Sequence, residues 1–315
     1  MDRMLLDILH LPTCAENLAY EEWYFAQFER ETLRLWVNPR SVVVGKHQNA
    51  LSECHFHFCR THHIPIVRRI SGGGTVYHDP GNVNFSFFRW VQKEKMIDYD
   101  RSLNMIHKAL QSLGYPVEMN ERHDLFLEGQ KISGNAQHLK KGRSLHHGTL
   151  LYDADLDLLR SSIKRPSGVF EDKAVRSVRS PINNLRSYKD LGDTPSFLQK
   201  LHATLIELNF EEAALPLERE ALNDAIKERY DSDDWNFGYS PHYVFRNAYK
   251  AFTVELEVER GGIIQNAKIR HEGEDTEYIA QQLIGQKHHY ANVEAVLKAV
   301  GLTPADAGSL LTALF

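Results

Sequence analysis

The chain contains few cysteines, three among 315 residues. Cys14, Cys54 and Cys59 are odd in number and show none of the spacings typical of a metal site or a disulfide framework. Free thiols persist in a reducing compartment. The sequence therefore predicts a cytoplasmic protein with reduced cysteines.

Long apolar runs and a strong charge of one sign are also missing. No apolar run approaches the roughly 20 residues that a membrane span needs, and the first ten residues lack the apolar centre of a signal peptide. The net charge of −5 argues against non-specific nucleic-acid binding, although local basic patches are compatible with it. We expect neither a membrane nor a nucleic acid as partner.

Length and composition are typical of a soluble globular protein. A chain of 315 residues, 42% of them hydrophobic, is long enough for one large domain and a smaller one. The 17 histidines are scattered. Adjacent pairs occur at His62-His63, His146-His147 and His288-His289, and neighbours on a strand face opposite sides. These pairs therefore do not predict a metal site.

The run of three glycines at 72–74 is the most informative local feature. A strand-like stretch at 64–67 leads into Arg68 and Arg69, and a second strand-like stretch covers 82–88. Consecutive glycines suit a backbone that approaches a ligand closely or adopts positive φ. Arginines beside free N–H groups suit a phosphate or carboxylate. The alternative interpretation is a tight hairpin turn with exposed arginines.

Four segments in a fixed order resemble one family. They are residues 41–54, the glycine-rich stretch 68–87, residues 131–137 (Lys-Ile-Ser-Gly-Asn-Ala-Gln) and residues 146–151 (His-His-Gly-Thr-Leu-Leu). Together they resemble the lipoate–protein ligase A family, in the superfamily that also holds biotin protein ligases and octanoyltransferases. Residues 235–238 are a weaker match, and the resemblance covers nearly the whole chain.

The resemblance implies that Lys131 is the catalytic residue. In the family this lysine contacts the acyl carboxylate and the α-phosphate of the nucleotide. A fixed ammonium would offset the repulsion of these two anions and stabilise charge that develops on the phosphoryl oxygens. The resemblance places the other ATP- and lipoate-binding positions at Arg69, Gly72, Gly73, Gly74, Thr75, Val76, Tyr77, Asn82, Asp124 and His147.

Four polar residues each allow a second interpretation besides a ligand contact. Asn82, which shares a strand face with Asn84, also suits an Asx turn at 81–82. Asp124 suits magnesium or a ribose hydroxyl, or a buried structural carboxylate. His147 suits the adenylate, or a hydrogen-bonded strand histidine. Arg68 suits a ligand contact, or a solvated strand position.

Two further features follow from the resemblance. An acyl tail implies an apolar tunnel, with wall candidates Val44, Val76, Phe85 and Phe87. The basic stretch 163–187 resembles the mobile adenylate-binding loop of the family.

Within that stretch, Lys173, Arg176 and Arg179 are the candidate adenylate contacts. The alternative is a solvated charged surface. A loop that closes on the intermediate would exclude water from an anhydride that hydrolyses readily.

The predicted fold class is α+β. We expect a catalytic domain over 1–240, with a mixed and mostly antiparallel sheet flanked by helices, and a small α+β C-terminal accessory domain over 246–315. Hydrophobic periodicity predicts helices at 16–29, 99–113, 155–162, 194–208, 274–284 and 292–300, and strands at 32–37, 41–45, 124–128, 131–138, 144–152, 252–258 and 263–269.

The predicted function is that of an ATP-dependent lipoate–protein ligase. Lipoate, or octanoate, would be activated to an acyl-AMP with Mg²⁺ on the triphosphate. The acyl group would pass to a lysine of apo lipoyl domains, in 2-oxoacid dehydrogenase acyltransferase subunits or the glycine-cleavage H protein.

Three alternatives remain. One is an octanoyltransferase that uses a cysteine thioester, although all three cysteines precede residue 60. The others are a biotin ligase and a non-catalytic lipoyl-binding adaptor.

Overall fold

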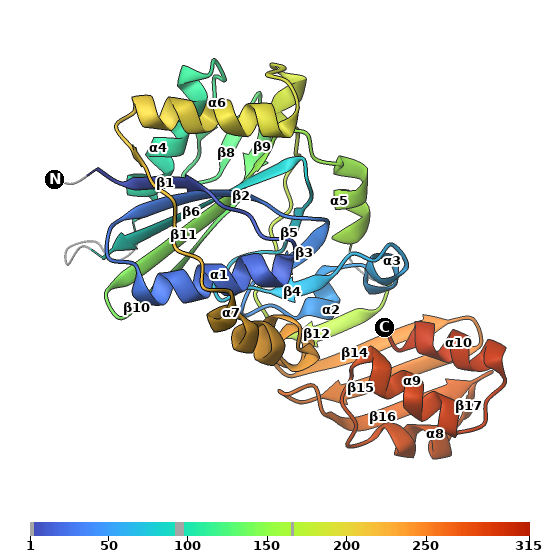
Figure 1. The fold of residues 1–315 in the computed structure, drawn as a ribbon. Helices are drawn as coiled ribbons and strands as arrows, with labels where there is room; N and C mark the ends of the chain where they lie inside the picture. The colour runs from blue at the N-terminus through green and yellow to red at the C-terminus, as the bar shows by residue number, and fades with distance from the viewer. Residues whose placement is uncertain (1–2, 92–97, 165–166) are drawn as a thin grey trace.

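The large part of the chain is built on a six-stranded mixed sheet (Figure 1). The computed structural model describes residues 3–91, 98–164 and 167–315. Only the pairs that β1 forms with its two neighbours are parallel. The fold is therefore α+β with a mostly antiparallel sheet, as predicted. In order across the sheet the strands are β10 (Asn135–Lys140), β11 (Arg143–Leu151), β6 (Asn82–Trp90), β2 (Thr32–Val37), β1 (Leu5–Ile8) and β13 (Glu211–Glu212).

Helices cover both faces of this sheet (Figure 1). Helices α4 (Tyr99–Ser112) and α6 (Thr194–Glu207) share an apolar cluster with Phe85 and Phe87 of β6. Helix α1 (Cys14–Gln27) packs on the other face against Phe88, because successive strand residues point to opposite sides. All three helices were predicted to within two residues, and each begins at a side-chain cap.

A small three-stranded sheet carries the glycine-rich loop. Its central strand β3 (Ser41–Val44) pairs with β4 (Ile66–Arg68) on one side and β5 (Val76–His78) on the other. The loop at 69–75 joins β4 to β5, so it crosses over one end of β3. Two short helices, α2 (Ala50–Glu53) and α3 (Phe56–Thr61), lie between β3 and β4 in the sequence.

The single strand predicted at 131–138 is wrong. Strand β9 (Gln130–Ser133) belongs to a separate small sheet with β8 (Leu125–Leu127) and β7 (Glu118–Met119), whereas β10 begins at Asn135 in the six-stranded sheet. Gly134 marks the break, and its N–H and C=O bond to Thr149 on β11. The hydrophobic pattern of the sequence continues across Gly134 without a visible break. Periodicity alone therefore did not separate the two strands.

The C-terminal region forms a five-stranded sheet beside the large part (Figure 1). The predicted hairpin and helices are present, except that Glu274–Asp275 pair with β16, so the first helix begins at Glu277 and not at 274. Four of the five strands are β14 (Tyr243–Tyr249), β15 (Phe252–Val258), β16 (Ile264–His271) and β17 (Glu274–Asp275), and the helices are α8 (Glu277–Leu283), α9 (Tyr290–Ala299) and α10 (Pro304–Ala313).

The prediction that 163–187 is entirely loop is wrong. Strand β12 (Val169–Asp172) pairs antiparallel with β14, and Glu171 forms an ion pair with Arg246. Residues 165–166 of the predicted loop lie outside the described residues. The stretch therefore connects the large part to an edge of the C-terminal sheet.

Short helical elements complete the chain. They are α5 (Leu156–Ser162), the 3₁₀ turn η1 (Leu185–Ser187), α7 (Arg219–Ala225) and the π-helical turns η2 (Ile226–Tyr230) and η3 (Asp234–Gly238). None of the helices within 3–91, 98–164 and 167–315 combines the length and apolar character of a membrane span.

His288 makes the C-terminal packing sensitive to acid. Its neutral ring accepts from Tyr243 Oη at Nδ1 and donates to the Leu314 carbonyl at Nε2, both at 2.7 Å. Burial lowers the pKa of His288 to about 4, and nearby His289 adds to this. An unfolded histidine titrates near about 6.5, so the unfolded state binds more protons below that pH.

We therefore expect His288 alone to reduce the free energy of unfolding by about 1 kcal/mol between pH 6 and pH 5. Urea unfolding at both pH values measures this loss. His288→Gln should remove that share of the pH dependence. An unchanged difference between the two pH values in the variant would contradict the assignment.

Candidate functional site

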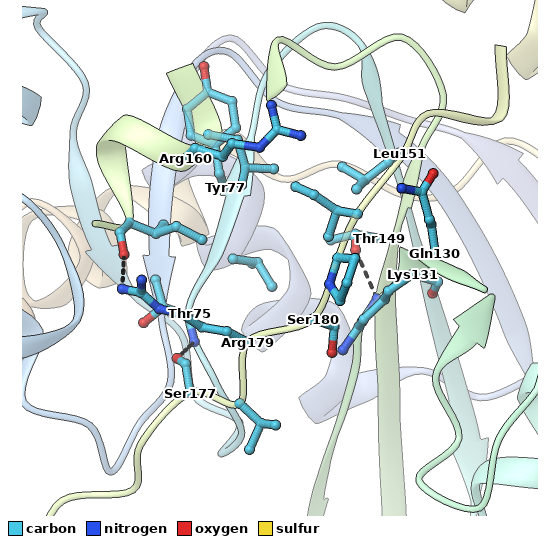
Figure 2. A pocket seen from close by; sticks show the side chains of 18 of the residues that line it. Thr75, Tyr77, Gln130, Lys131, Thr149, Leu151, Arg160, Ser177, Arg179 and Ser180 are labelled. Atoms are coloured by element: carbon cyan, nitrogen blue, oxygen red, sulfur yellow. Dashed lines mark hydrogen bonds between the residues drawn. The ribbon is translucent and has the colours of Figure 1, made fainter. Parts of the chain in front are cut away.

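Two adjoining cavities open beside the glycine-rich loop. The larger has a volume of about 360 Å³ and the smaller of about 210 Å³. Figure 2 shows the larger cavity, with Thr75 and Ser177 on one side and Lys131 and Thr149 on the other. The residues that line both cavities are Thr75, Val76, Lys131, Gly134, Thr149, Ser177 and Val178.

The glycine-rich loop is held in shape by Arg69. Its guanidinium donates to the carbonyls of Val43, Gly72 and Gly74 and to Ser71 Oγ. Arg69 is buried and lines the smaller cavity. The loop also needs glycine at 73, where φ is +85°.

Gly45, the residue directly after β3, lies against this loop. A Cβ at Gly45 would lie 2.2 Å from the Gly73 carbonyl oxygen and 3.2 Å from Arg69 Nη2. Both neighbours are fixed, so we expect Gly45→Ala to lower the free energy of unfolding by about 2 kcal/mol. Gly308→Ala on α10 is the matched control, because nothing lies within 4 Å of its added Cβ. Equal midpoints in urea for both variants would contradict the close approach.

Lys131 and Asp124 form an ion pair at the junction of the cavities. Lys131 Nζ lies 2.7 Å from Asp124 Oδ1, and the two side chains are 21% and 14% exposed. Both line the smaller cavity, and Lys131 also lines the larger one. The Lys131 ammonium can therefore meet an anion in either cavity.

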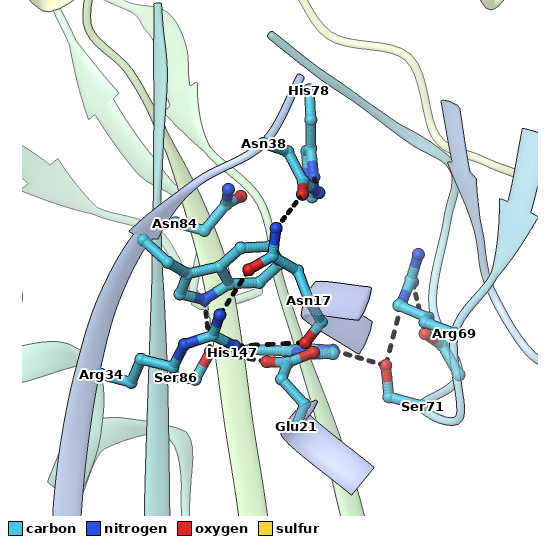
Figure 3. A network of polar contacts seen from close by, with 12 residues as sticks. Asn17, Glu21, Arg34, Asn38, Arg69, Ser71, His78, Asn84, Ser86 and His147 are labelled. Atoms are coloured by element: carbon cyan, nitrogen blue, oxygen red, sulfur yellow. Dashed lines mark hydrogen bonds and ion pairs between the residues drawn. The ribbon is translucent and has the colours of Figure 1, made fainter. Parts of the chain in front are cut away.

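A buried polar network links α1 to the loop (Figure 3). His147 Nε2 lies 2.6 Å from Ser71 Oγ, and His147 Nδ1 lies 3.1 Å from Glu21 Oε1. Burial alone would raise the pKa of Glu21, but His147, a hydrogen bond from Ser86 and the charge of Arg34 lower it below its usual range. Glu21 is therefore a buried carboxylate anion whose interactions hold His147 in place.

The order serine–histidine–glutamate resembles a nucleophilic triad, but its position excludes that role. Ser71 is 0% exposed, lines neither cavity, and accepts a hydrogen bond from Arg69 Nε. His147 and Glu21 do line the smaller cavity. The network fixes the loop, and its His147 and Glu21 side chains, unlike Ser71, border the smaller cavity.

The basic stretch lies across the larger cavity. Ser177 Oγ accepts from the Thr75 N–H and from Gln48 Nε2, and Gln48 Oε1 accepts from Thr75 Oγ1 and the Gly45 N–H. Gln48 thus ties the stretch to both β3 and the glycine-rich loop. Its position in the 41–54 motif was the sequence signal for this role.

Only one of the three basic candidates of this stretch faces the cavity. Arg179 lines it and donates to the Ile163 carbonyl (Figure 2). Arg176 pairs with Asp172 instead, at 3.0 Å. Lys173 is exposed and lines neither cavity.

Most of the predicted binding residues gather at the cavities. Gly72 and Asn82 line neither. Asn82 Nδ2 donates to Asn84 Oδ1 at 2.9 Å, and Asn84 lines the smaller cavity with an Nδ2 that has no partner among the described residues. The smaller cavity is lined by Arg69, Gly73, Gly74, Thr75, Val76, Asp124, Lys131 and His147, and the larger by Thr75, Val76, Tyr77 and Lys131.

Both interpretations of Arg68 are wrong, because it is fully buried and all its side-chain hydrogen bonds go to protein atoms. Of the four residues predicted for the tunnel wall, Val76 lines both cavities. Val44, Phe85 and Phe87 lie in the core and line neither cavity. The apolar lining of the smaller cavity comes from Leu18, Trp36, Val43, Val76, Ala136 and Val178.

The cysteines lie in positions that do not suit a nucleophile. All three cysteines are buried and line neither cavity. Burial raises the pKa of Cys14 to about 12 and of Cys59 to about 11, and that of Cys54 well above its usual value. Within the part of the chain that is described, no three His, Cys, Asp or Glu side chains gather as metal ligands.

A family model and the sequences of known proteins point to the same family. Residues 13–206 match the lipoyl protein ligase A/B catalytic domain. The chain is 32% identical over 300 residues to lipoate–protein ligase LplJ of Bacillus subtilis, covering 91% of each chain.

Two solved structures share the fold and part of the sequence. A lipoate–protein ligase A crystallised with bound ATP has a TM-score of 0.63 at 26% identity, over 76% of this chain and 100% of that one. A bipartite ligase of Thermoplasma acidophilum, studied with its E2 lipoyl domain, has a TM-score of 0.64 at 25% identity, over 76% and 97%.

Proposed function

The chain belongs to the lipoyl protein ligase A/B family and is a lipoate–protein ligase, and we propose that it works through an acyl-adenylate in the two adjoining cavities. The carboxylate oxygen of lipoate attacks the α-phosphorus of ATP, and the bond to pyrophosphate breaks. The ε-amine of an acceptor lysine then attacks the acyl carbon, AMP leaves, and the amine loses its proton.

The observation that carries this proposal is the position of Lys131 in the walls of both cavities. The smaller cavity suits the acyl chain, because its lining includes Leu18, Trp36 and Val43. The larger cavity suits the nucleotide, with Arg160 and Arg179 among its lining residues. Lys131 then neutralises the carboxylate and the α-phosphate where they meet.

The residues present fit a magnesium ion that arrives with the triphosphate. Magnesium is bound by one or two carboxylates together with substrate phosphates. Asp124 is the carboxylate next to Lys131 and would hold the ion. When bound, the ion would supply charge neutralisation on the phosphate oxygens, and Asp124 would release its bond to Lys131.

The acceptor is an apo lipoyl domain. The Thermoplasma ligase was studied with an E2 lipoyl domain, which supports the acyltransferase subunits of 2-oxoacid dehydrogenases as acceptors. The glycine-cleavage H protein is the other acceptor that we propose. We assign the chemistry to residues 1–240 and an accessory role to residues 246–315.

The alternative octanoyltransferase mechanism needs a cysteine thiolate at the acyl group. Cys14, Cys54 and Cys59 are buried away from both cavities, with raised pKa values. This disfavours a thioester intermediate. Lipoate and octanoate remain candidate acids for the same cavity.

The test is transfer of free lipoate to a purified apo lipoyl domain, read as a mass increase of the acceptor. We expect modification only with ATP and magnesium, together with release of AMP and pyrophosphate. Acceptor modification from octanoyl carrier protein without ATP, and none from free lipoate, would overturn the proposal.

A further inference from the structure

A third cavity, which we call the basic groove, lies outside the two substrate cavities. Its volume is about 300 Å³. It is bordered by α1, the β10–β11 hairpin and the turns η2 and η3, which follow α7 near α1 in Figure 1. Its wall carries Lys46, Lys140, Lys141, Arg143 and Arg229, with Phe25 among the apolar residues below them.

Most of this positive charge is unpaired. Glu22 is the one carboxylate in the wall of the groove, and it bonds to Arg229 and to Tyr230 Oη. None of the other four cations forms an ion pair with a carboxylate within the described ranges; Lys46 lies over the Tyr239 ring, and Arg143 over the Phe28 and Trp90 rings. The buried Nε of Arg143 also has no hydrogen-bond partner there.

Two of the cations act on a histidine in the same groove. Burial lowers the pKa of His138, which lines the groove, to about 4, and the charges of Lys46 and Lys140 add to this. At neutral pH the histidine therefore adds no charge. A cluster of unpaired cations on a chain with net charge −5 is a local positive field suited to an acidic partner.

Two elements connect the groove to the smaller substrate cavity. On α1, Leu18 and Glu21 line the cavity, and Glu22 and Phe25 line the groove. This spacing places all four residues on one side of the helix, so that side borders both the cavity and the groove. The glycine-rich loop borders both as well, because Gly73 and Gly74 line the cavity and Ile70 lines the groove.

Strand β10 makes the same connection. Ala136 lines the cavity, and His138 and Lys140 line the groove. Residues two apart share a strand face, so the cavity and the groove open on one side of the sheet, with His138 about 7 Å and Lys140 about 13 Å along the strand from Ala136. A protein whose lysine enters the acyl cavity would place its neighbouring surface over the groove.

We propose that the basic groove binds an acidic surface of the acceptor protein next to the lysine that is modified. This inference rests on the proposed ligase function, which brings a protein to the adjoining cavity. Unpaired cations at an interface speed encounter with an acidic partner and fix its orientation. A single short groove does not follow a nucleic-acid backbone, so a protein partner is favoured over a nucleic acid.

The test separates acceptor recognition from adenylate formation. Lys140→Glu with Lys141→Glu reverses two exposed charges of the hairpin. With an apo lipoyl domain as the acceptor at low salt, we expect kcat/KM for the acceptor to fall at least tenfold, mainly through KM. Lipoate-dependent ATP–pyrophosphate exchange without acceptor should stay unchanged. The dependence of kcat/KM on salt should become less steep.

The matched control is Lys108→Glu with Lys200→Glu, which makes the same change in net charge on α4 and α6, on the other face of the sheet. We expect acceptor kcat/KM to stay within twofold. A lipoyl domain whose acidic residues nearest the target lysine are changed to lysine should recover activity with the Lys140→Glu, Lys141→Glu enzyme.

Three results would overturn the inference. One is an acceptor KM no higher than that of the control variant. Another is that the Lys140→Glu, Lys141→Glu enzyme recovers no activity with the lysine-substituted lipoyl domain. The third is that this enzyme loses binding to a nucleic acid while its KM for the acceptor stays unchanged. If the unaltered enzyme forms no lipoyl-AMP, the proposed function itself fails, and pyrophosphate exchange reports that outcome separately.

Discussion

Lys131→Met should reduce lipoate-dependent ATP–pyrophosphate exchange at least about 1000-fold. The ammonium of Lys131 lines both cavities and lies 2.7 Å from Asp124. Methionine keeps most of the length of the side chain and removes its charge and its hydrogen-bond donors. Two anions would then meet without a cation between them, so the barrier to adenylate formation rises.

The fold should survive this change. The Lys131–Asp124 pair is partly exposed, so its loss should alter the free energy of unfolding by about 1 kcal/mol or less. Transfer from supplied lipoyl-AMP should fall less than exchange does, because the anhydride is already formed. Lys108→Met on α4, an exposed lysine, is the control and should keep full activity.

Normal exchange in Lys131→Met would rule out the electrostatic role. If the unaltered protein bound the acceptor but formed no adenylate, and Lys131→Met bound it equally well, the chain would be an adaptor. Asp124→Asn adds a second comparison. It frees the ammonium, so a loss of exchange there would support magnesium binding by Asp124.

The sequence predicted the site where chemistry is carried by a recognisable local motif. The glycine-rich loop and the lysine segment are each a short continuous stretch, and the structure brings their predicted site residues Gly73, Thr75 and Lys131 to the cavity walls. Glu21 was missed, because its partner His147 is 126 residues away. A carboxylate between Leu18 and Phe25 on the buried side of α1 was the available signal.

The fold was predictable where an element has a clear hydrophobic periodicity and is bounded by its own capping residue or turn. Helix α4 and the hairpin of β15 and β16 are examples. Strand β12 was not, because four residues in a basic, polar stretch pair with a strand more than 70 residues away. Its pairing depends on the free edge of β14, which local sequence does not reveal.

Arg68 shows the same limit at a single side chain. Its position beside Arg69 and the glycines left a ligand contact and a solvated side chain equally open. The guanidinium of Arg68 instead donates to backbone carbonyls of two distant segments. It donates to Gly45, Lys46 and Gln48 on one side, and to Trp235 and Asn236 on the other. The segment 235–238, a weak motif in the sequence, is thus the backbone partner of Arg68.

Arg68→Met should therefore lower the free energy of unfolding by roughly 3 to 4 kcal/mol, because it leaves several buried carbonyls without donors. Burial lowers the pKa of Arg68 to about 10, which shows how fully it is removed from water. The variant no longer has to bury a charge, which offsets part of the lost stability. The expected decrease in the free energy of unfolding is therefore smaller than the summed contributions of the Arg68 hydrogen bonds. Urea unfolding measures it, with Arg219→Met, at an exposed position, as the control.

The same variant should raise the KM for ATP, because Arg68 holds the Gln48 carbonyl and the Gln48 side chain holds Thr75 and Ser177 at the larger cavity. Arg68→Lys should lie between the native protein and Arg68→Met, since an ammonium has three donors and cannot reach both segments. If Arg68→Met were no less stable than Arg219→Met, the carbonyls would be satisfied without the guanidinium. The loop at 45–48 would then be fixed by β3 alone, and the effect on ATP should vanish with it.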